Sequence, residues 1–255
     1  MFSFLLFIVV LIFVNGFMEL QFINQDINNF IDCCEYEEEI VYKEYKINLY
    51  CCKAEKDNEK NNYLDTITIS DNKIYLGNKS DIIVTNRNPF NRYGGAFLTD
   101  VAEMVVHPLY SGHAAVNLSV NEIIECVGIG DGDSVRIKEN CWFDDIIDFG
   151  QEDETYVGLR FKNVSQEDKE KYTTELKKEV NKKYTYSYFI HTKNTYYCTD
   201  LVTRIAKKID VNLNYDGFVS TGNDIIISDN TFIIFIVRKI DLKNKIINIY
   251  YMKEE

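Results

Sequence analysis

Apolar residues of this chain fall mostly into short runs bounded by Asn, Asp and Gly, a pattern typical of β-strands. β-rich segments flank Asp71-Asn72, a pair that commonly closes hairpins, and the run that begins at Ser80-Asp81 continues as a buried strand. These runs alternate with helical patterns, so the periodicities indicate a mixed α+β domain. Further strands are expected at 133–138, 154–161, 231–240 and 245–253.

Residues 113–127 predict a β-hairpin, because two apolar runs are separated by only a few polar positions. The register of this hairpin depends on the length of its loop. A three-residue loop at 118–120 pairs His113 directly with Glu125, whereas a five-residue loop places Glu125 diagonal to His113 on the same face. A four-residue loop would instead face Cys126 to His113.

Helical patterns occur in three segments. Residues 96–106 form a short apolar helix candidate. In 165–183 apolar positions recur at every fourth residue, and Ser165 suits an N-cap. Residues 199–209 carry one apolar stripe directly after Cys198. Cys198 is therefore expected at the N-terminus of a helix.

Composition and charge limit the class of protein. At 255 residues, 46% of them hydrophobic, the chain is long enough to bury one substantial core or two small ones. Its formal net charge of −12 argues against a nucleic-acid partner, because duplex and single-strand binding both need a concentrated cationic surface. An acidic surface of this kind mainly favours solubility.

Residues 1–16 form an apolar run that is too short to span a bilayer comfortably and that ends with a spacing suited to signal peptidase. We therefore expect a cleaved secretory signal and a protein that is extracellular or lies in the secretory-pathway lumen. The run contains no Lys or Arg, so an uncleaved membrane anchor is the alternative, and only in that case is a membrane partner expected. A Cys-rich N-terminal region at 17–75 and a main domain at 76–255 should follow.

The cysteine count fits an oxidising compartment and leaves one thiol over. If the two doublets bridge each other and Cys126 joins Cys141, the unpaired cysteine is Cys198. Six bridging cysteines allow about fifteen arrangements, so the sequence leaves the connectivity open. None of the spacings resembles a zinc site, and we expect no metal and no cofactor. The seven cysteines are Cys33, Cys34, Cys51, Cys52, Cys126, Cys141 and Cys198.

A cysteine at a helix N-terminus can act as a nucleophile, because the unpaired N–H groups and the aligned peptide dipoles stabilise its thiolate. Such a thiolate needs a base. The chain has three histidines, His107, His113 and His191, and of these His113 opens a predicted strand with an acid, Glu125, twelve residues later. Cys198, His113 and Glu125 therefore match the template of thiolate, imidazole and orienting carboxylate.

Four segments, "SDIIV", "SGHAAV", "IIECV" and "YYCTDLV", occur in this order and carry a family resemblance. The chain resembles the permuted papain-like cysteine hydrolases of the YiiX/YebB type, relatives of the NlpC cell-wall peptidases and of the lecithin:retinol acyltransferase-like proteins. The order His, acid, Cys marks the permuted branch of this superfamily. The resemblance spans roughly residues 76 to 240. It departs from the family pattern in Ser80 for Gly, in Thr199-Asp200 for Ser-Glu, and in the Cys-rich segment before residue 62, which has no counterpart.

By this resemblance the fold should be α+β and papain-like: a circularly permuted NlpC-type antiparallel sheet, on which the helix carrying the catalytic cysteine packs, with 76–255 as the catalytic domain. Cys198 would be the nucleophile, His113 the general base and then acid, and Glu125 the residue that orients the imidazole. The backbone N–H of Cys198 is the candidate oxyanion donor.

The function implied is that of a secreted thiol hydrolase that cleaves peptide or peptidoglycan-like amide bonds through a thioester. One alternative is a lipid-directed acyltransferase or esterase that acts on an acyl substrate with the same triad. Another is an inert secreted binding module. Tyr196, Tyr197 and Trp142 could line a substrate groove, although core packing is the commoner role of aromatic side chains.

Overall fold

The computed structural model describes most of the chain. The predicted helix at 96–106, two of the histidines, His107 and His191, and the Asp71-Asn72 turn lie outside the described residues. Within the described part, side chains are not described for residues 2–13, 15–16 and 239–240. The described residues are 2–53, 66–70, 73–86, 112–128, 133–149, 154–187, 192–215, 217, 219–241 and 243–253.

Most described strands belong to one large mixed sheet. Its order is β1-β2-β13-β12-β9-β5-β6-β7-β8-β10-β11, and β3 pairs with β4 in a separate hairpin. Neighbours in the large sheet are antiparallel except for two parallel pairs, β2 with β13 and β10 with β11. The strands are β1 (Cys34–Tyr42), β2 (Tyr45–Lys53), β3 (Ile67–Ser70), β4 (Lys73–Leu76), β5 (Ile82–Thr85), β6 (His113–Asn117), β7 (Glu122–Val127), β8 (Ser134–Glu139), β9 (Thr155–Phe161), β10 (Lys183–Tyr184), β11 (Thr195–Tyr196), β12 (Thr231–Asp241) and β13 (Ile246–Lys253).

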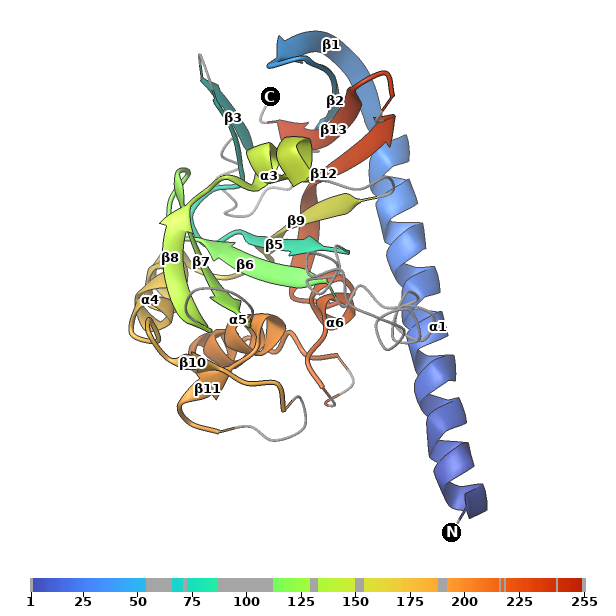
Figure 1. Cartoon of the computed structure of the whole chain (residues 1–255), viewed down its shortest axis with the longest axis vertical. Helices are drawn as coiled ribbons and strands as arrows, with labels where there is room; N and C mark the ends of the chain where they lie inside the picture. Colours follow the sequence, from blue (N-terminus) through green and yellow to red (C-terminus); the bar gives the residue numbers. More distant parts are fainter. Residues whose placement is uncertain are drawn as a thin grey trace.

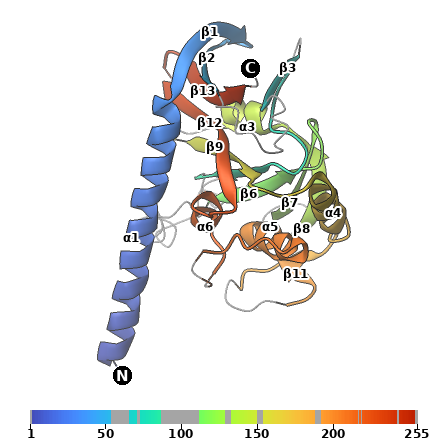
Figure 2. The same ribbon diagram turned by 180° about the vertical axis from the view of Figure 1, so that it is seen from behind.

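Helices cover both faces of this sheet, and Figures 1 and 2 show the long α1 running along one side of the molecule. α1, α4, α5 and α6 contribute to one core cluster and α3 to the other. The helices are α1 (Phe2–Asp32), α3 (Trp142–Phe149), α4 (Gln166–Lys177), α5 (Cys198–Ala206) with the 3₁₀ turn η2 (Lys207–Ile209), and α6 (Gly222–Ile226). The protein is therefore a mixed α+β structure, as its periodicities predict.

Two hydrophobic cores lie on opposite faces of the sheet, because successive strand residues point to opposite sides. In β5, Ile82 and Val84 belong to one cluster and Ile83 to the other. In β6, Ala114 and Ala115 divide in the same way. The central strands are thus buried on both faces, which explains why their sequences are continuous apolar runs rather than alternating ones.

The N-terminal region is part of the same architecture. β2 pairs with β13 along its whole length, so the Cys-rich segment extends the sheet that holds the later strands. In α1, Ile23 and Ile27 are fully buried in the core that also contains α5, and Glu19 accepts a hydrogen bond of 3.0 Å from Asn223 of α6. Among the residues whose side chains are described, no helix has the length and hydropathy needed to span a bilayer.

The expected strands at 133–138, 154–161, 231–240 and 245–253 are confirmed as β8, β9, β12 and β13. The helix expected from 165 is α4, in which the Ser165 hydroxyl accepts from the Asp168 amide as an N-cap, although α4 ends at Lys177. The hairpin register follows the five-residue-loop alternative. Ala115 pairs with Glu125, which puts Glu125 diagonal to His113 on the same face.

One disulfide joins the two cysteine doublets, between Cys33 and Cys52. The expected bridge between Cys126 and Cys141 is wrong, because both are free thiols. Cys126 points into the core and donates to the Tyr196 carbonyl, whereas Cys141 precedes α3 on the other face. Cys198 is free as expected. Four other cysteines, Cys34, Cys51, Cys126 and Cys141, are free as well, so the cysteine count does not single out Cys198.

A buried ion pair fixes the entrance to β5. Arg160 of β9 donates from Nε to Asp81 Oδ1 at 2.8 Å and from Nη2 to Oδ2 at 2.7 Å. Asp81 Oδ2 also accepts from the Asn78 amide at 2.7 Å. Because both side chains are buried, each charge depends on the other for compensation.

Arg160→Ala should therefore lower the free energy of unfolding by about 3–5 kcal/mol, since it leaves the Asp81 carboxylate buried and uncompensated. Denaturant unfolding measures this change. Lys79→Ala, which removes an exposed ion pair with Glu170, is the control and should cost about 0–1 kcal/mol. Equal losses for the two variants would contradict this assignment.

Ile27→Ala should lower the free energy of unfolding by about 2–5 kcal/mol, because it opens a cavity between α1 and the sheet. Phe22→Ala on the exposed side of the same helix should change it by about 0.5 kcal/mol or less. If both variants unfold at the wild-type denaturant concentration, the packing of α1 on the core is not required for stability.

Candidate active site

The start of α5 is held in place by the segment before it. Tyr197 is the N-cap residue, with an extended backbone and no side-chain cap hydrogen bond, and Cys198 is the first residue of the helix. The first-turn amides are therefore not capped by a side chain at that position, and an uncapped helix N-terminus favours negative charge. α5 itself packs against β6 and β7, where His113 and Glu125 lie.

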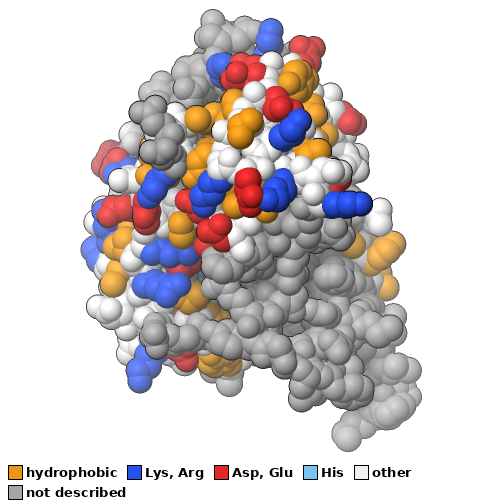
Figure 3. All heavy atoms as spheres, turned by 45° about the horizontal axis from the view of Figure 1, so that its top comes forward, with side chains coloured by type: hydrophobic (Ala, Val, Ile, Leu, Met, Phe, Trp, Pro, Cys, Tyr) orange, Lys and Arg blue, Asp and Glu red, His pale blue; other side chains and the backbone are white. Residues whose placement is uncertain are grey.

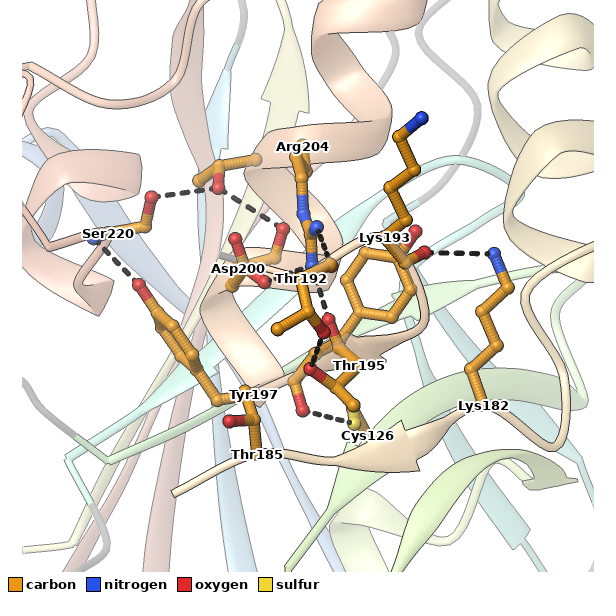
Figure 4. Close-up of polar contacts among 12 residues, drawn as sticks. Cys126, Lys182, Thr185, Thr192, Lys193, Thr195, Tyr197, Asp200, Arg204 and Ser220 are labelled. Atoms are coloured by element: carbon orange, nitrogen blue, oxygen red, sulfur yellow. Dashed lines mark hydrogen bonds and ion pairs between the residues drawn. The ribbon is translucent and has the colours of Figure 1, made fainter. Parts of the chain in front are cut away.

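Arg204 links the segment before Cys198 to helix α5. Figure 4 shows its guanidinium reaching the backbone carbonyls of Thr192 and Thr195 and the carboxylate of Asp200. The guanidinium also lies 3.9 Å from the centre of the Tyr196 ring, a cation–π contact. One side chain thus connects both sides of the turn that presents Cys198.

Ser220 holds the other side of the same turn. Its amide donates to the Tyr197 hydroxyl at 3.0 Å, and its carbonyl accepts from the Thr199 hydroxyl at 2.6 Å. Its own hydroxyl is bonded to Thr203, one turn further along α5. Ser220 thus fixes the residues on either side of Cys198, and Figure 4 shows its contact with Tyr197.

The structure brings the Cys198 thiol to the His113 imidazole. The two side chains interact electrostatically, the thiol also donates to the Gly112 carbonyl oxygen at 3.9 Å, and Cys198 is 8% exposed. Burial raises the pKa of Cys198, but the hydrogen bond and the charge of His113, with the amides of Ala114 and Thr199, outweigh it and lower the pKa. Burial likewise lowers the pKa of His113, while Cys198 and Glu125 raise it above its ordinary value. Both shifts favour the thiolate and imidazolium forms of the pair.

Glu125 occupies the other side of the imidazole. Its Oε2 lies 2.9 Å from His113 Nε2. Because an ionised carboxylate only accepts, Nε2 carries a proton and Nδ1 is left to face the thiol. The carboxyl is 2% exposed, and burial raises its pKa, but His113, Lys138 and Arg136 together hold that pKa well below its usual range.

The aromatic residues considered for a groove are core residues. Tyr196, Tyr197 and Trp142 are each buried. The Trp142 ring lies 5.8 Å from the His113 ring with an interplanar angle of 27°, so it stacks on the imidazole from the α3 side. Trp142 therefore contributes to the site by holding the imidazole rather than by an exposed surface.

The remaining free thiols differ from Cys198 in their electrostatics. Burial raises the pKa of each of them, and for Cys34 it does so to about 12. Since thiolate content decides reactivity, these thiols should be inert beside Cys198. The other free cysteines are Cys34, Cys51, Cys126 and Cys141.

One group among the described residues has the composition of a metal site. The sulfur atoms of Cys33, Cys34 and Cys52 lie within 4.8 Å of one another. Two of them form the disulfide, so a soft metal ion could be held there only after reduction. This group lies on the β1–β2 ribbon, and β13, β12, β9 and β5 separate it from β6.

The face seen in Figure 3 carries cations and anions side by side. Among the described residues several charges form ion pairs, as Lys43 does with Asp144 and Lys138 with Asp145. A mixed pattern of this kind suits a soluble surface rather than a steering field for a highly charged partner.

Two side chains at the site were not singled out from the sequence. Arg136 lies directly opposite Glu125 in the β7–β8 ladder, and Lys138 lies two residues further along the same face. The sequence contains a signal for both residues, because apolar and polar residues alternate along β8 and β8 follows the expected hairpin in the chain. Their importance depends on the register of three strands, which the sequence left open.

Comparison with known proteins adds no relative to these observations. No protein-family model matches the chain, and no curated protein matches it either. What the chain does is therefore inferred from the geometry of Cys198, His113 and Glu125.

Proposed function

We propose that the protein is a thiol hydrolase that cleaves amide bonds through a Cys198–His113–Glu125 triad. The observation that carries the proposal is a cysteine at a helix N-terminus that interacts with an imidazole whose Nε2 lies 2.9 Å from a buried carboxylate. The resemblance to permuted papain-like hydrolases of the YiiX/YebB type, on the motifs around these same residues, supports the reaction class and a papain-like assignment of the fold.

In the proposed reaction the Cys198 thiolate attacks the carbonyl carbon of the amide, and a C–S bond forms as the carbonyl π electrons move to oxygen. The tetrahedral intermediate collapses, the C–N bond breaks, and the His113 imidazolium gives its proton to the leaving amine. His113 then takes a proton from water as the water oxygen attacks the thioester. The C–S bond breaks, the carboxylic acid is released, and the Cys198 thiolate is regenerated.

The backbone N–H of Cys198 is the proposed oxyanion donor. It belongs to the first turn of α5, where helix N–H groups have no partner within the helix. A donor fixed in this way needs little reorganisation when negative charge develops on the carbonyl oxygen. Arg204 and Ser220, which hold the two sides of this turn, would keep the donor in place.

We also propose that the protein is exported. The apolar segment 1–16 has the length and the end of a secretory signal, and the Cys33–Cys52 disulfide is compatible with an oxidising compartment. Peptide and peptidoglycan-like amides in such a compartment are the proposed substrates.

Iodoacetamide should alkylate Cys198 faster than any other cysteine of the folded protein at pH 7. Because the pKa of Cys198 is lowered, the alkylation rate should rise at a pH below that of an ordinary thiol and stay high through neutrality. In His113→Ala the thiolate loses its partner, and the rate at pH 7 should fall by about tenfold or more, since each unit of pKa changes the thiolate content about tenfold. Peptide mapping with time and pH measures both effects.

Cys141→Ser is the matched control for this experiment, because Cys141 is also a free thiol and has a raised pKa. It should leave labelling of Cys198 unchanged. An unreactive Cys198, or labelling that does not depend on His113, would remove the basis for a hydrolase and favour a binding module.

A screen of substrates tests the reaction itself. Fluorogenic peptidyl amides and peptidoglycan stem peptides should be cleaved, and Cys198→Ala should lower kcat by about 10³-fold or more because the covalent step is lost. Long-chain acyl esters belong in the same screen. Turnover of the esters without turnover of any amide would replace the amidase with a lipid-directed acyltransferase or esterase.

A further inference from the structure

Two cations, Arg136 and Lys138, lie next to Glu125, the acid of the triad. Arg136 donates from Nε to Glu125 Oε1 at 2.9 Å, and its Nη2 forms an ion pair with the same oxygen at 2.8 Å. Lys138 Nζ lies 3.4 Å from the same oxygen. Oε2 is left for His113, so the two oxygens of one buried carboxylate have separate partners.

Strand register explains this arrangement. Arg136 is the direct partner of Glu125 in the β7–β8 ladder, and Lys138 follows on the same face. Lys138 also lies 3.6 Å from Asp145 of α3 and 5.9 Å from the centre of the Trp142 ring, which stacks on His113. The cations therefore link the triad acid to the helix that covers the imidazole.

We propose that Arg136, assisted by Lys138, is a positioning residue of the active site that keeps Glu125 ionised and aimed at His113. The inference rests on the proposed function and extends it to residues that touch neither the thiol nor a substrate. The guanidinium contacts Oε1 alone and so leaves Oε2 for His113. A buried carboxylate with only His113 beside it would be far less well compensated.

Loss of Arg136 should raise the pH at which the Cys198 thiolate forms. If Glu125 keeps its charge but loses its main counter-ion, the added negative field disfavours the thiolate. If Glu125 instead turns away or takes up a proton, the imidazolium loses its acceptor and the thiolate loses its cation. Both routes make the thiolate form only at higher pH. The charged groups facing this region are Arg136 and Lys138 from β8, Glu125 from β7, His113 from β6, Asp145 from α3, and Asp200 and Arg204 from α5.

The test is the pH profile of Cys198 alkylation by iodoacetamide in the full-length protein. Arg136→Gln should move the rise of the profile upward by about 0.5 pH unit or more and slow labelling at neutral pH. Arg136→Lys keeps the charge but loses the paired N–H groups, so it should recover part of the shift. Lys138→Gln should shift the profile less, because its contact is longer. Lys79→Gln, which removes an exposed cation paired with Glu170, should leave the profile unchanged.

A double-variant cycle shows whether Arg136 acts through Glu125. In a Glu125→Gln background, Arg136→Gln should cause no further shift. An equal shift in both backgrounds, an unchanged profile in Arg136→Gln, or a shift to lower pH would overturn the inference. Denaturant unfolding of each variant separates these effects from loss of the fold, because a purely structural role would lower stability without moving the profile.

Failure of the role proposed for Arg136 can be distinguished from failure of the proposed hydrolase function. A wild-type Cys198 with the reactivity of an ordinary buried thiol would remove the hydrolase proposal together with this one. A reactive wild-type Cys198 whose profile ignores Arg136 would remove only the role of Arg136.

Discussion

The packing of α5 on β6 is the contact on which the candidate site depends. It brings the first residue of a helix, Cys198, to the first residue of a strand, His113, although the two lie far apart in the sequence. Neither element could shift along the other without separating thiol from imidazole. The surrounding interactions restrict such shifts: Arg204 and Ser220 fix the turn before α5, and Trp142 holds the imidazole from the far side of the sheet.

Asp81 and Glu125 are both buried carboxylates, but their surroundings differ. Asp81 gives both oxygens to Arg160 and one of them also to a backbone amide, so its bonding capacity is directed inward. Glu125 gives one oxygen to cations and keeps the other for His113. The enclosed Asp81–Arg160 pair holds strands together. Glu125 has one oxygen bound to cations, so its other oxygen can orient His113.

The sequence predicted much of the core and part of the site. Continuous apolar runs identified the central strands because those strands are buried on both faces, and an apolar stripe after Cys198 identified α5. The register of the hairpin remained one of three alternatives, since loop length cannot be read from the polar residues between 117 and 123 alone. The resemblance selected Cys198, His113 and Glu125 for reasons independent of register.

Other parts were missed for identifiable reasons. α3 was not expected because "WFDDIIDF" is short, although its apolar positions recur at the spacing of a helix. The acidic run of β1 did not suggest a strand, since an edge strand tolerates charge on its exposed side. Cysteine counting assumed maximal pairing, while the fold places Cys126 and Cys141 on different sides of the sheet. Ser80, with φ of 71°, stands where the resembling family has Gly, which suits that left-handed backbone.

If the protein is exported as proposed, the long helix α1 has a consequence for the order of cleavage and folding. The expected cleavage point after residue 16 lies inside one continuous helix, and Ile23, only seven residues later, is buried in the core. A peptidase needs an extended, accessible backbone, so a cut at this position must precede the docking of α1. If the leader is cleaved there, α1 would dock on the core only after the leader has been removed.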